Sequence, residues 1–186
     1  HEPSFIGKEK ELVSKTIEST FVSSVGKYVD KFEEDLAKFT GRNKAIAIVN
    51  GTSALHLSML MAGVKPGDYV ITQSLTFVAT ANAITYNNAI PVFLDVDLDT
   101  MGLSPNAVEI FLEEYGEVRE SGCYNKKTGR RIAACMPMHT FGFPVHLDEL
   151  IVVCEKWNIP IVEDAAESIG SSYKGKPTGS FGLVGA

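Results

Sequence analysis

The segment after the apolar run Ile159–Val162 carries the side chains best suited to chemistry. That run predicts a central strand, and it leads into two carboxylates, Glu163 and Asp164. The small residues Ala165 and Ala166 come next. A carboxylate at the carboxyl end of a central strand lies where open α/β sheets bind ligands, and small neighbours leave room for a flat ring. Asp164 could therefore pair with a protonated pyridine nitrogen, as in pyridoxal phosphate (PLP) enzymes, although a helix or turn cap explains a lone aspartate equally well.

A second candidate site is the glycine turn after the apolar run Ala45–Val49, which predicts another strand. Gly51, Thr52 and Ser53 lead into the helix predicted for Thr52–Met61. Backbone N–H groups at a helix start are free, the helix dipole favours an anion, and the two hydroxyls add donors. The turn is a predicted phosphate site, although an ordinary capped helix fits too. It lacks the Gly-Lys-Ser/Thr of a Walker loop and the spacing of a dinucleotide fingerprint.

Two further residues follow predicted strands. Phe77 comes after the strand Tyr69–Thr72 and could stack on a planar cofactor, although a lone phenylalanine there would more often be a core residue. His139 comes after the strand Ile132–Met138 and could contact substrate or cofactor, with a hydrogen-bonded structural histidine as the alternative. The phosphate turn, the aromatic ring and the acidic strand end share one edge of the predicted sheet.

The elements that position these residues alternate along the chain. The predicted strands are Ala45–Val49, Tyr69–Thr72, Ile90–Val96, Ile132–Met138 and Ile159–Asp164, and the predicted helices are Lys8–Ser19, 26–40, Thr52–Met61, Phe77–Tyr86, 105–114 and His146–Trp157, with a loop over 117–130. Helices between strands require parallel pairing with right-handed crossovers, and apolar strands indicate helices on both faces. The predicted fold class is α/β, a three-layer α/β/α arrangement with a mostly parallel sheet.

Composition limits the classes of partner. The formal net charge of −6 argues against a nucleic-acid surface, and no run of about 18 apolar residues predicts a membrane span. Cys135 and Cys154 are predicted core residues, and Cys123 is a predicted loop residue. The odd number of cysteines fits a reducing cytoplasm. The cysteines have no metal-ligand spacing, Asp95 and Asp97 indicate a turn, and no metal site is predicted.

The ordered motifs resemble the DegT-type sugar aminotransferases, which are PLP enzymes of fold type I. The resemblance runs nearly end to end. The matching motifs are Pro3–Gly7 with Glu9, Phe21–Gly26, Val29–Glu33, Gly51–Leu55, Thr76–Ala83, His139–Gly142 and Glu163–Ser168. Within the family, Met136–Thr140 and Gly102–Pro105 resemble the branch that acts on nucleotide-linked 4-keto-6-deoxy-N-acetylhexosamines, of the legionaminic acid or bacillosamine type.

The resemblance implies PLP as cofactor. The implied cofactor-binding residues are Gly51, Thr52, Ser53, Phe77, Asp164 and Glu167, and the catalytic candidates are Asp164 and His139. Thr52 and Ser53 would hold the phosphate, and Phe77 would stack on the ring. Asp164 would pair with the ring nitrogen. Glu167 would approach the ring hydroxyl, where many relatives carry glutamine; an ionised Glu167 would oppose a phenolate there, so a protonated carboxyl or a bridging water is expected.

One family feature has no counterpart in the chain. In the family, the lysine of a Ser-Phe-x-x-x-Lys stretch forms the Schiff base with PLP, and none of the lysines of this chain stands in that motif. We therefore expect an N-terminal fragment that is inactive alone. Residues 1–25 would form an N-terminal helix and arm, residues 26–186 a partial PLP-binding large domain, and the C-terminal domain would be absent. The resemblance further implies a nucleotide-sugar substrate, an amino-acid donor such as glutamate, a homodimer and a cytoplasmic location.

Three alternatives remain open at this point. The same family includes PLP-dependent sugar dehydratases in which histidine replaces the lysine. A non-catalytic ligand-binding fragment would bind PLP without turnover. A plain nucleotide-binding α/β domain would bind NAD or ATP and not PLP.

Overall fold

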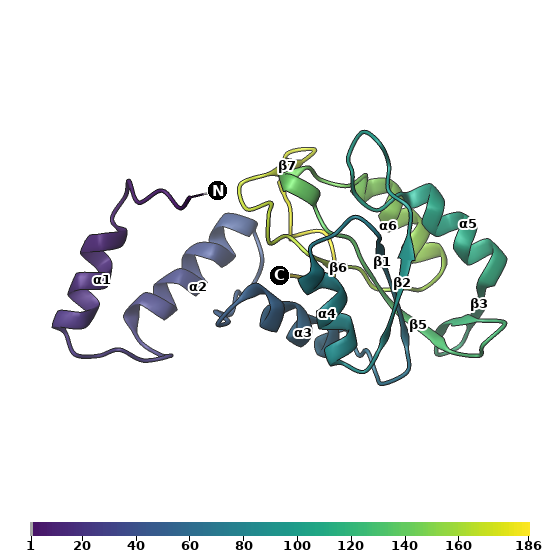
Figure 1. Cartoon of the computed structure of the whole chain (residues 1–186), viewed down its shortest axis with the longest axis horizontal. Coiled ribbons are helices and arrows are strands. Elements are labelled where there is room, and N and C mark those ends of the chain that lie inside the picture. The colour runs from purple at the N-terminus through teal and green to yellow at the C-terminus, as the bar shows by residue number, and fades with distance from the viewer. Residues whose placement is uncertain (1) are drawn as a thin grey trace.

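Three parallel strands form the centre of the fold (Figure 1). In the computed structural model, which describes residues 2–186, β1 (Tyr69–Gln73) lies between β2 (Ile90–Leu94) and β5 (Arg131–Met136). It pairs in parallel with both neighbours, as the apolar runs predict. The mostly parallel sheet of the predicted fold class is confirmed.

The outer edge of β5 is shared by two further elements. Near its start, β5 pairs with an antiparallel hairpin. Near its end, parallel bridges join Cys135 to Ile161 and Met138 to Asp164. The last predicted strand is therefore present, but only β6 (Val162–Glu163) has regular strand geometry. β6 pairs in parallel with β9 (Val184–Gly185), close to the C-terminus.

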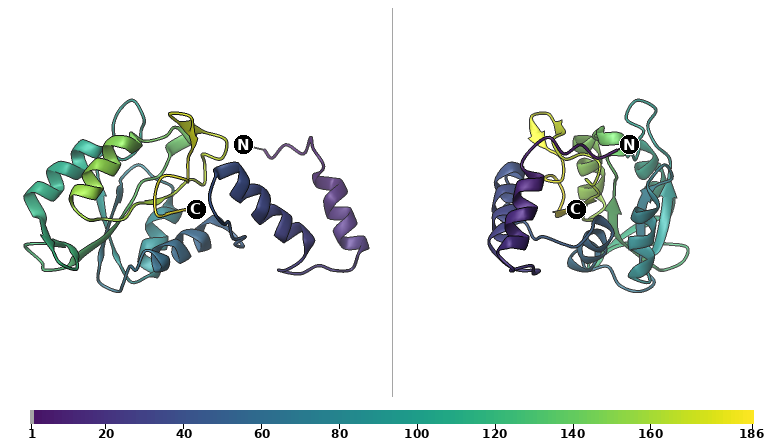
Figure 2. Two further views of the ribbon diagram at one scale, coloured as in Figure 1. Left: turned by 180° about the vertical axis from the view of Figure 1, so that it is seen from behind. Right: turned by 60° about the vertical axis from the view of Figure 1, so that its left-hand side comes forward.

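Helices cover both faces of the sheet (Figures 1 and 2). α3 (Gly51–Met61) and α4 (Val78–Tyr86) pack on one face, and α5 (Pro105–Tyr115) and α6 (Leu147–Lys156) pack on the other. Successive strand residues point to opposite faces, so each strand supplies both cores. The α3–α4 core contains Val70 and Met136, whereas the α5–α6 core contains their neighbours Ile71 and Cys135. The three-layer arrangement is confirmed.

Local sequence signals set several helix ends. α5 starts where a serine followed by proline predicts it, and the Ser104 hydroxyl accepts a hydrogen bond from the N–H of Ala107 at 3.4 Å. α2 (Lys27–Thr40) ends at Gly41, whose φ of 69° is the left-handed conformation that glycine adopts without strain.

The strand predicted for Ala45–Val49 is wrong. This segment has no regular secondary structure, and Val49 is 88% exposed. A strand exists only through hydrogen bonds to a neighbour, and nothing within residues 2–186 pairs with this segment. Within the described residues, the backbone of this segment has one long-range hydrogen bond. The N–H of Ala47 donates to the side-chain carboxylate of Glu33 at 2.8 Å. An apolar run alone is therefore not sufficient evidence for a strand.

The loop predicted for residues 117–130 is wrong for most of its length, although residues 126–130 are turn and loop as predicted. β3 (Gly116–Arg119) and β4 (Gly122–Asn125) form an antiparallel hairpin on the edge of the sheet. Cys123, predicted in a loop, lies in β4 and is fully buried against the α5–α6 core. The short strands carry too few apolar residues to be distinguished from a loop by periodicity.

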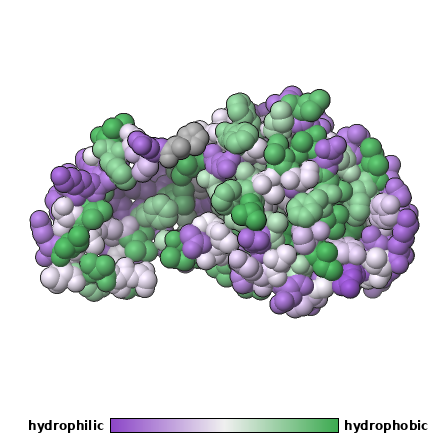
Figure 3. All heavy atoms as spheres, viewed as in Figure 1, coloured by the Kyte–Doolittle hydropathy of each residue, from purple (hydrophilic) through white to green (hydrophobic). Residues whose placement is uncertain are grey.

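The N-terminal segment extends away from the sheet (Figures 1 and 2). α1 (Glu9–Glu18) has no buried residue. Large apolar side chains are exposed along this arm and α2, and they give the green areas on the left of Figure 3. They include Phe5, Ile6, Leu12, Val13, Ile17, Phe21, Val22, Val25, Phe32 and Phe39. None of the helices within residues 2–186 is long and apolar enough to cross a lipid bilayer. The division at residue 25 stays a prediction.

The remaining short elements belong to the loops after β5 and β6. They are the 3-10 helix η1 (Thr140–Gly142) and the two strands of a small hairpin, β7 (Ser172–Tyr173) and β8 (Lys176–Pro177).

Candidate functional site

Asp164 lies directly after β6, at the carboxyl end of the sheet, as the sequence predicts. Its side chain is buried, with 3% exposure. One carboxylate oxygen accepts a hydrogen bond from the Thr80 hydroxyl at 2.7 Å, and the other accepts a long one from the N–H of Ala166 at 3.3 Å. A buried carboxylate thus has only one strong donor within the described chain.

The electrostatics of Asp164 follow from this environment. Burial raises the pKa of the Asp164 carboxyl, and the hydrogen bonds from Thr80 and from the N–H of Ala166 offset only part of that effect. A cation placed against the carboxylate would lower its pKa again, because an opposite charge favours the ionised form. The site therefore suits a cationic group such as a protonated ring nitrogen.

Thr80 is a site residue that the sequence reasoning missed. It lies in the first turn of α4, three residues after Phe77 and therefore on the same side of the helix. It also accepts a hydrogen bond from the Thr76 hydroxyl at 2.7 Å. The signal was present in the sequence as hydroxyls at positions 76 and 80, four residues apart, but without the fold nothing assigned a partner to them.

Phe77 lies beside this network. Its backbone N–H contacts the sulfur of Met138 at 3.4 Å, and Met138 pairs with Asp164 across the neighbouring strand ends. The Phe77 side chain is 64% exposed. The exposed ring is free to stack on a planar cofactor. Its stacking role stays a prediction.

The predicted phosphate turn forms the start of α3. Asn50 caps this helix, with its side-chain oxygen accepting from the N–H of Ser53 at 2.8 Å. Among the described residues, the N–H groups of Gly51 and Thr52 have no hydrogen-bond acceptor. A Cβ added at Gly51 would meet no atom within 4 Å, so the space in front of the turn is open. Free donors at a helix start with open space before them suit an anion.

A hollow of about 620 Å³ lies between α2, the start of α3 and the residues around β9. Asn50 and Gly51 line it from the start of α3, and Ala165 lines it from the residue after Asp164. Phe77 and Asp164 themselves are not among its lining residues; they lie on the α4 side. The strand end and the phosphate turn therefore border the same region of the carboxyl edge.

Glu167 has a backbone partner. Its carboxylate accepts a hydrogen bond from the N–H of Phe141 at 2.7 Å. Phe141 has a φ of 54°, so this contact stabilises a strained turn after β5. The proposed approach of Glu167 to a ring hydroxyl stays a prediction.

His139 and Glu163 form a fully buried pair. The ring nitrogen Nε2 of His139 lies 3.2 Å from the Glu163 carboxylate, and Nδ1 accepts from the N–H of Val145 at 3.4 Å. Because Nδ1 accepts this bond, Nε2 is the ring nitrogen that donates to Glu163. Both nitrogens have protein partners, which favours a structural role for His139; direct contact with substrate or cofactor stays a prediction.

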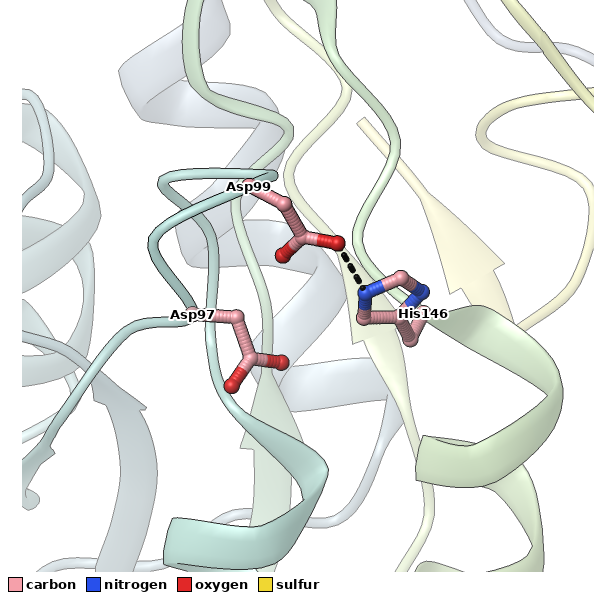
Figure 4. Close-up of side chains that lie close together, drawn as sticks. All are labelled: Asp97, Asp99 and His146. Carbon is pink, nitrogen blue, oxygen red and sulfur yellow. Dashed lines mark hydrogen bonds and ion pairs between the residues drawn. The ribbon is translucent and has the colours of Figure 1, made fainter.

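A separate group of polar side chains lies after β2 and at the start of α6 (Figure 4). His146 and Asp99 are hydrogen-bonded at 2.9 Å, and the ligand atoms of Asp97, Asp99 and His146 lie within 4.8 Å of one another. Asp99 is largely exposed, and its pairing with His146 already accounts for the arrangement. We assign no metal to it.

Comparisons with known proteins identify a family for the chain. The sequence pattern of the DegT/DnrJ/EryC1/StrS aminotransferase family matches residues 3–186. EpsN of Bacillus subtilis (strain 168), by name a pyridoxal phosphate-dependent aminotransferase, is 40% identical over 183 residues, or 98% of this chain and 45% of EpsN. GDP-perosamine synthase of Escherichia coli O157:H7 is 37% identical over 184 residues, or 99% of this chain and 46% of that protein. The chain thus spans somewhat less than half the length of these relatives.

A solved structure gives the same result for the fold. The aminotransferase from Psychrobacter cryohalolentis matches with a TM-score of 0.84 and 28% identity, over 98% of this chain and 42% of that one.

Proposed function

Because the chain belongs to the DegT/DnrJ/EryC1/StrS aminotransferase family, we propose that the protein of which it forms part uses PLP to transfer an amino group to a nucleotide-linked 4-keto-6-deoxy sugar. The relatives are more than twice as long as this chain, so the proposed activity belongs to the whole protein. This chain would supply the cofactor-binding half of the site.

The observation that carries the proposal is the environment of Asp164. A buried carboxylate with a raised pKa accepts a hydrogen bond from Thr80, three residues after the exposed Phe77 on α4, and the residue after Asp164 borders the hollow at the start of α3. When bound, PLP supplies an electron sink that stabilises a carbanion next to the transferred nitrogen. Asp164 would hold the proton on the ring nitrogen, and Thr80 would keep Asp164 oriented. The start of α3 would bind the phosphate.

The size of the Asp164 contribution can be estimated. Two opposite charges about 4 Å apart attract by roughly 4 kcal/mol at an effective dielectric near 20. That raises the pKa of a pyridine nitrogen by up to about 3, because 1.36 kcal/mol corresponds to one unit. Replacement of Asp164 by asparagine removes the charge and keeps the shape.

The first experiment titrates the chain with PLP and follows the absorbance of the cofactor. We expect saturable binding that weakens at least tenfold in Asp164→Asn, with circular dichroism unchanged. Asp99→Asn is the matched control, because Asp99 is an exposed aspartate on another loop. Equal PLP affinity in Asp164→Asn and the original chain would contradict the proposal, as would preferential binding of NAD or ATP.

The second experiment addresses the whole protein. The gene region that extends this chain would be expressed, and transfer of label from ¹⁵N-glutamate to a sugar nucleotide would be followed by mass spectrometry. Loss of water from the sugar without nitrogen incorporation would instead support the dehydratase alternative. PLP binding with neither reaction would support a non-catalytic role.

The sugar branch is the finest part of the proposal. The stretches Met136–Thr140 and Gly102–Pro105 resemble the branch that acts on 4-keto-6-deoxy-N-acetylhexosamines, whereas three relatives are GDP-perosamine synthases. The assay therefore compares a UDP-linked N-acetylated keto sugar with a GDP-linked keto sugar that lacks the acetamido group. We expect higher kcat/KM for the acetylated substrate.

The proposal includes a cytoplasmic homodimer with glutamate as the amino donor. The exposed apolar side chains of the N-terminal arm and α2 support an interface there, because large exposed apolar surfaces mark contacts with other proteins. Sedimentation of the extended protein measures its oligomeric state.

A further inference from the structure

Glu163 is a charged residue that the proposed cofactor chemistry does not use, although it is fully buried. Its carboxylate accepts four hydrogen bonds. The N–H groups of Phe181 and Gly182 donate at 2.6 Å each, the N–H of Gly179 at 2.8 Å, and Nε2 of His139 at 3.2 Å. Burial alone would raise the pKa of Glu163, but the His139 and backbone hydrogen bonds outweigh it and hold the pKa below its usual value.

These bonds hold one turn, Gly179–Gly182, against the end of β6. The fit is close, since a Cβ added at Gly182 would lie 2.5 Å from the carbonyl oxygen of Ile161. The turn leads directly into β9, and the N–H of Leu183 donates to that same Ile161 oxygen at 2.8 Å. The Glu163 side chain therefore sets where β9 begins.

β9 in turn borders Asp164 on one side. The N–H of Ala186 donates to the Glu163 carbonyl at 2.9 Å, and the Ala186 carbonyl accepts from the N–H of Ala165 at 2.7 Å. The residues immediately before and after Asp164 are thus both hydrogen-bonded to Ala186.

On its other side, Asp164 is bonded to the segment that follows β5. The N–H of Asp164 donates to the Pro137 carbonyl at 2.9 Å, and the Asp164 carbonyl accepts from the N–H of His139 at 3.1 Å. His139 therefore binds Asp164 through its backbone and Glu163 through its ring. The adjacent residues Glu163 and Asp164 are thus both hydrogen-bonded to His139.

We propose that Glu163, together with His139, is a positioning residue that fixes the turn Gly179–Gly182 and β9, and through them aims the Asp164 carboxylate at the cofactor. The expected effect of Glu163 on PLP binding rests on the proposed PLP function. The hydrogen bonds from which we infer the positioning role are independent of that function. Both Glu163 oxygens are bonded to protein donors, so Glu163 would act through Asp164 and not by contact with a ligand.

Glu163→Gln is the variant that tests the proposal. Glutamine keeps the size of the side chain, but its NH₂ group faces N–H donors in place of an acceptor oxygen. We expect amide exchange at Gly179, Phe181 and Gly182 to accelerate at least tenfold and PLP affinity to fall about tenfold. Glu155→Gln, an exposed site on α6, is the control and should change neither.

A double-mutant cycle separates positioning from a general structural role. If Glu163 acts through Asp164, then Asp164→Asn should weaken PLP binding much less in the Glu163→Gln background than in the original chain. Additive losses would overturn the proposal, and so would unchanged PLP affinity despite a mobile turn.

Two further measurements keep the test decisive. If the original chain binds no PLP, the proposed function fails, and the inference is then tested by the ¹³C titration of the Asp164 carboxyl. Replacement of Thr80 by valine should shift that titration in the original chain and shift it less than half as far in Glu163→Gln; equal shifts would overturn the inference.

The second measurement applies if Glu163→Gln does not fold. His139→Gln retains a side-chain N–H donor, so amide exchange of the turn and PLP affinity should change in the same directions as expected for Glu163→Gln, but less. No change in either quantity would overturn the inference.

Discussion

The hydrogen bond from Thr80 to Asp164 gives the most direct test of the site. The two oxygen atoms are 2.7 Å apart and both side chains are buried. Thr80→Val removes the hydroxyl and keeps the branched shape. A hydrogen bond to a charged group contributes about 1.5–3 kcal/mol, whereas one to a neutral group contributes about 0.5–1.5 kcal/mol. The variant should therefore destabilise the ionised form of Asp164 more than the protonated form.

The sign of the pH dependence follows from this difference. Burial already raises the pKa of Asp164 above its usual 3.8, and loss of the Thr80 bond should raise it further. A carboxyl whose pKa is raised in the folded state favours the folded protein below the unfolded pKa, and this stability is lost as pH rises through the folded pKa. Thr80→Val should thus cost about 1.5–3 kcal/mol of unfolding free energy above that range and less below it.

Two measurements check this reasoning. Urea unfolding at several pH values gives the stability difference, and ¹³C NMR of labelled aspartate gives the titration of Asp164. Thr85→Val is the matched control, because Thr85 lies on the same helix, is exposed, and donates only to the carbonyl of Asn82. An Asp164 titration that is identical in Thr80→Val and the original chain would refute the assigned hydrogen bond and its role.

Three other predictions concern the scaffold. Gly182→Ala should destabilise the fold by at least about 2 kcal/mol, because its Cβ would lie 2.5 Å from the backbone oxygen of Ile161; unchanged chemical denaturation would show that the turn can move. Leu150→Ala should cost about 2–5 kcal/mol, since Leu150 is fully buried in the α5–α6 core; a loss below 1 kcal/mol in urea would contradict that packing. The lowered pKa of Glu163 stabilises the fold above the unfolded value of 4.5, and this contribution is lost as pH falls through the folded pKa. Acid titration of stability should therefore be less steep in Glu163→Gln than in the original chain, and equal slopes would argue against an ionised Glu163.

The candidate site was predictable in part. Asp164 could be predicted because a carboxylate directly after an apolar run marks the ligand-binding edge of a parallel sheet, and the structure places it there. Glu163 stands one position earlier on the same strand, but alternation turns its side chain to the opposite face. There it binds the turn Gly179–Gly182, which is 16 or more residues away in the sequence. No local feature of the sequence assigns a partner to the Glu163 carboxylate or to the Thr80 hydroxyl.

The sequence alone determined the features that depend on neighbours along the chain. Helical spacing and end signals place α2, α5 and α6, because caps, prolines and glycines act within one helical turn. Apolar runs likewise place β1, β2 and β5. Pairing between distant segments was decided by the tertiary structure. Ala45–Val49 has the composition of a strand but no partner within residues 2–186, whereas the polar segment 116–125 forms a hairpin because the edge of β5 accepts it. Strand hydrogen bonds join residues far apart in the sequence, so only the folded arrangement decides which segments form them.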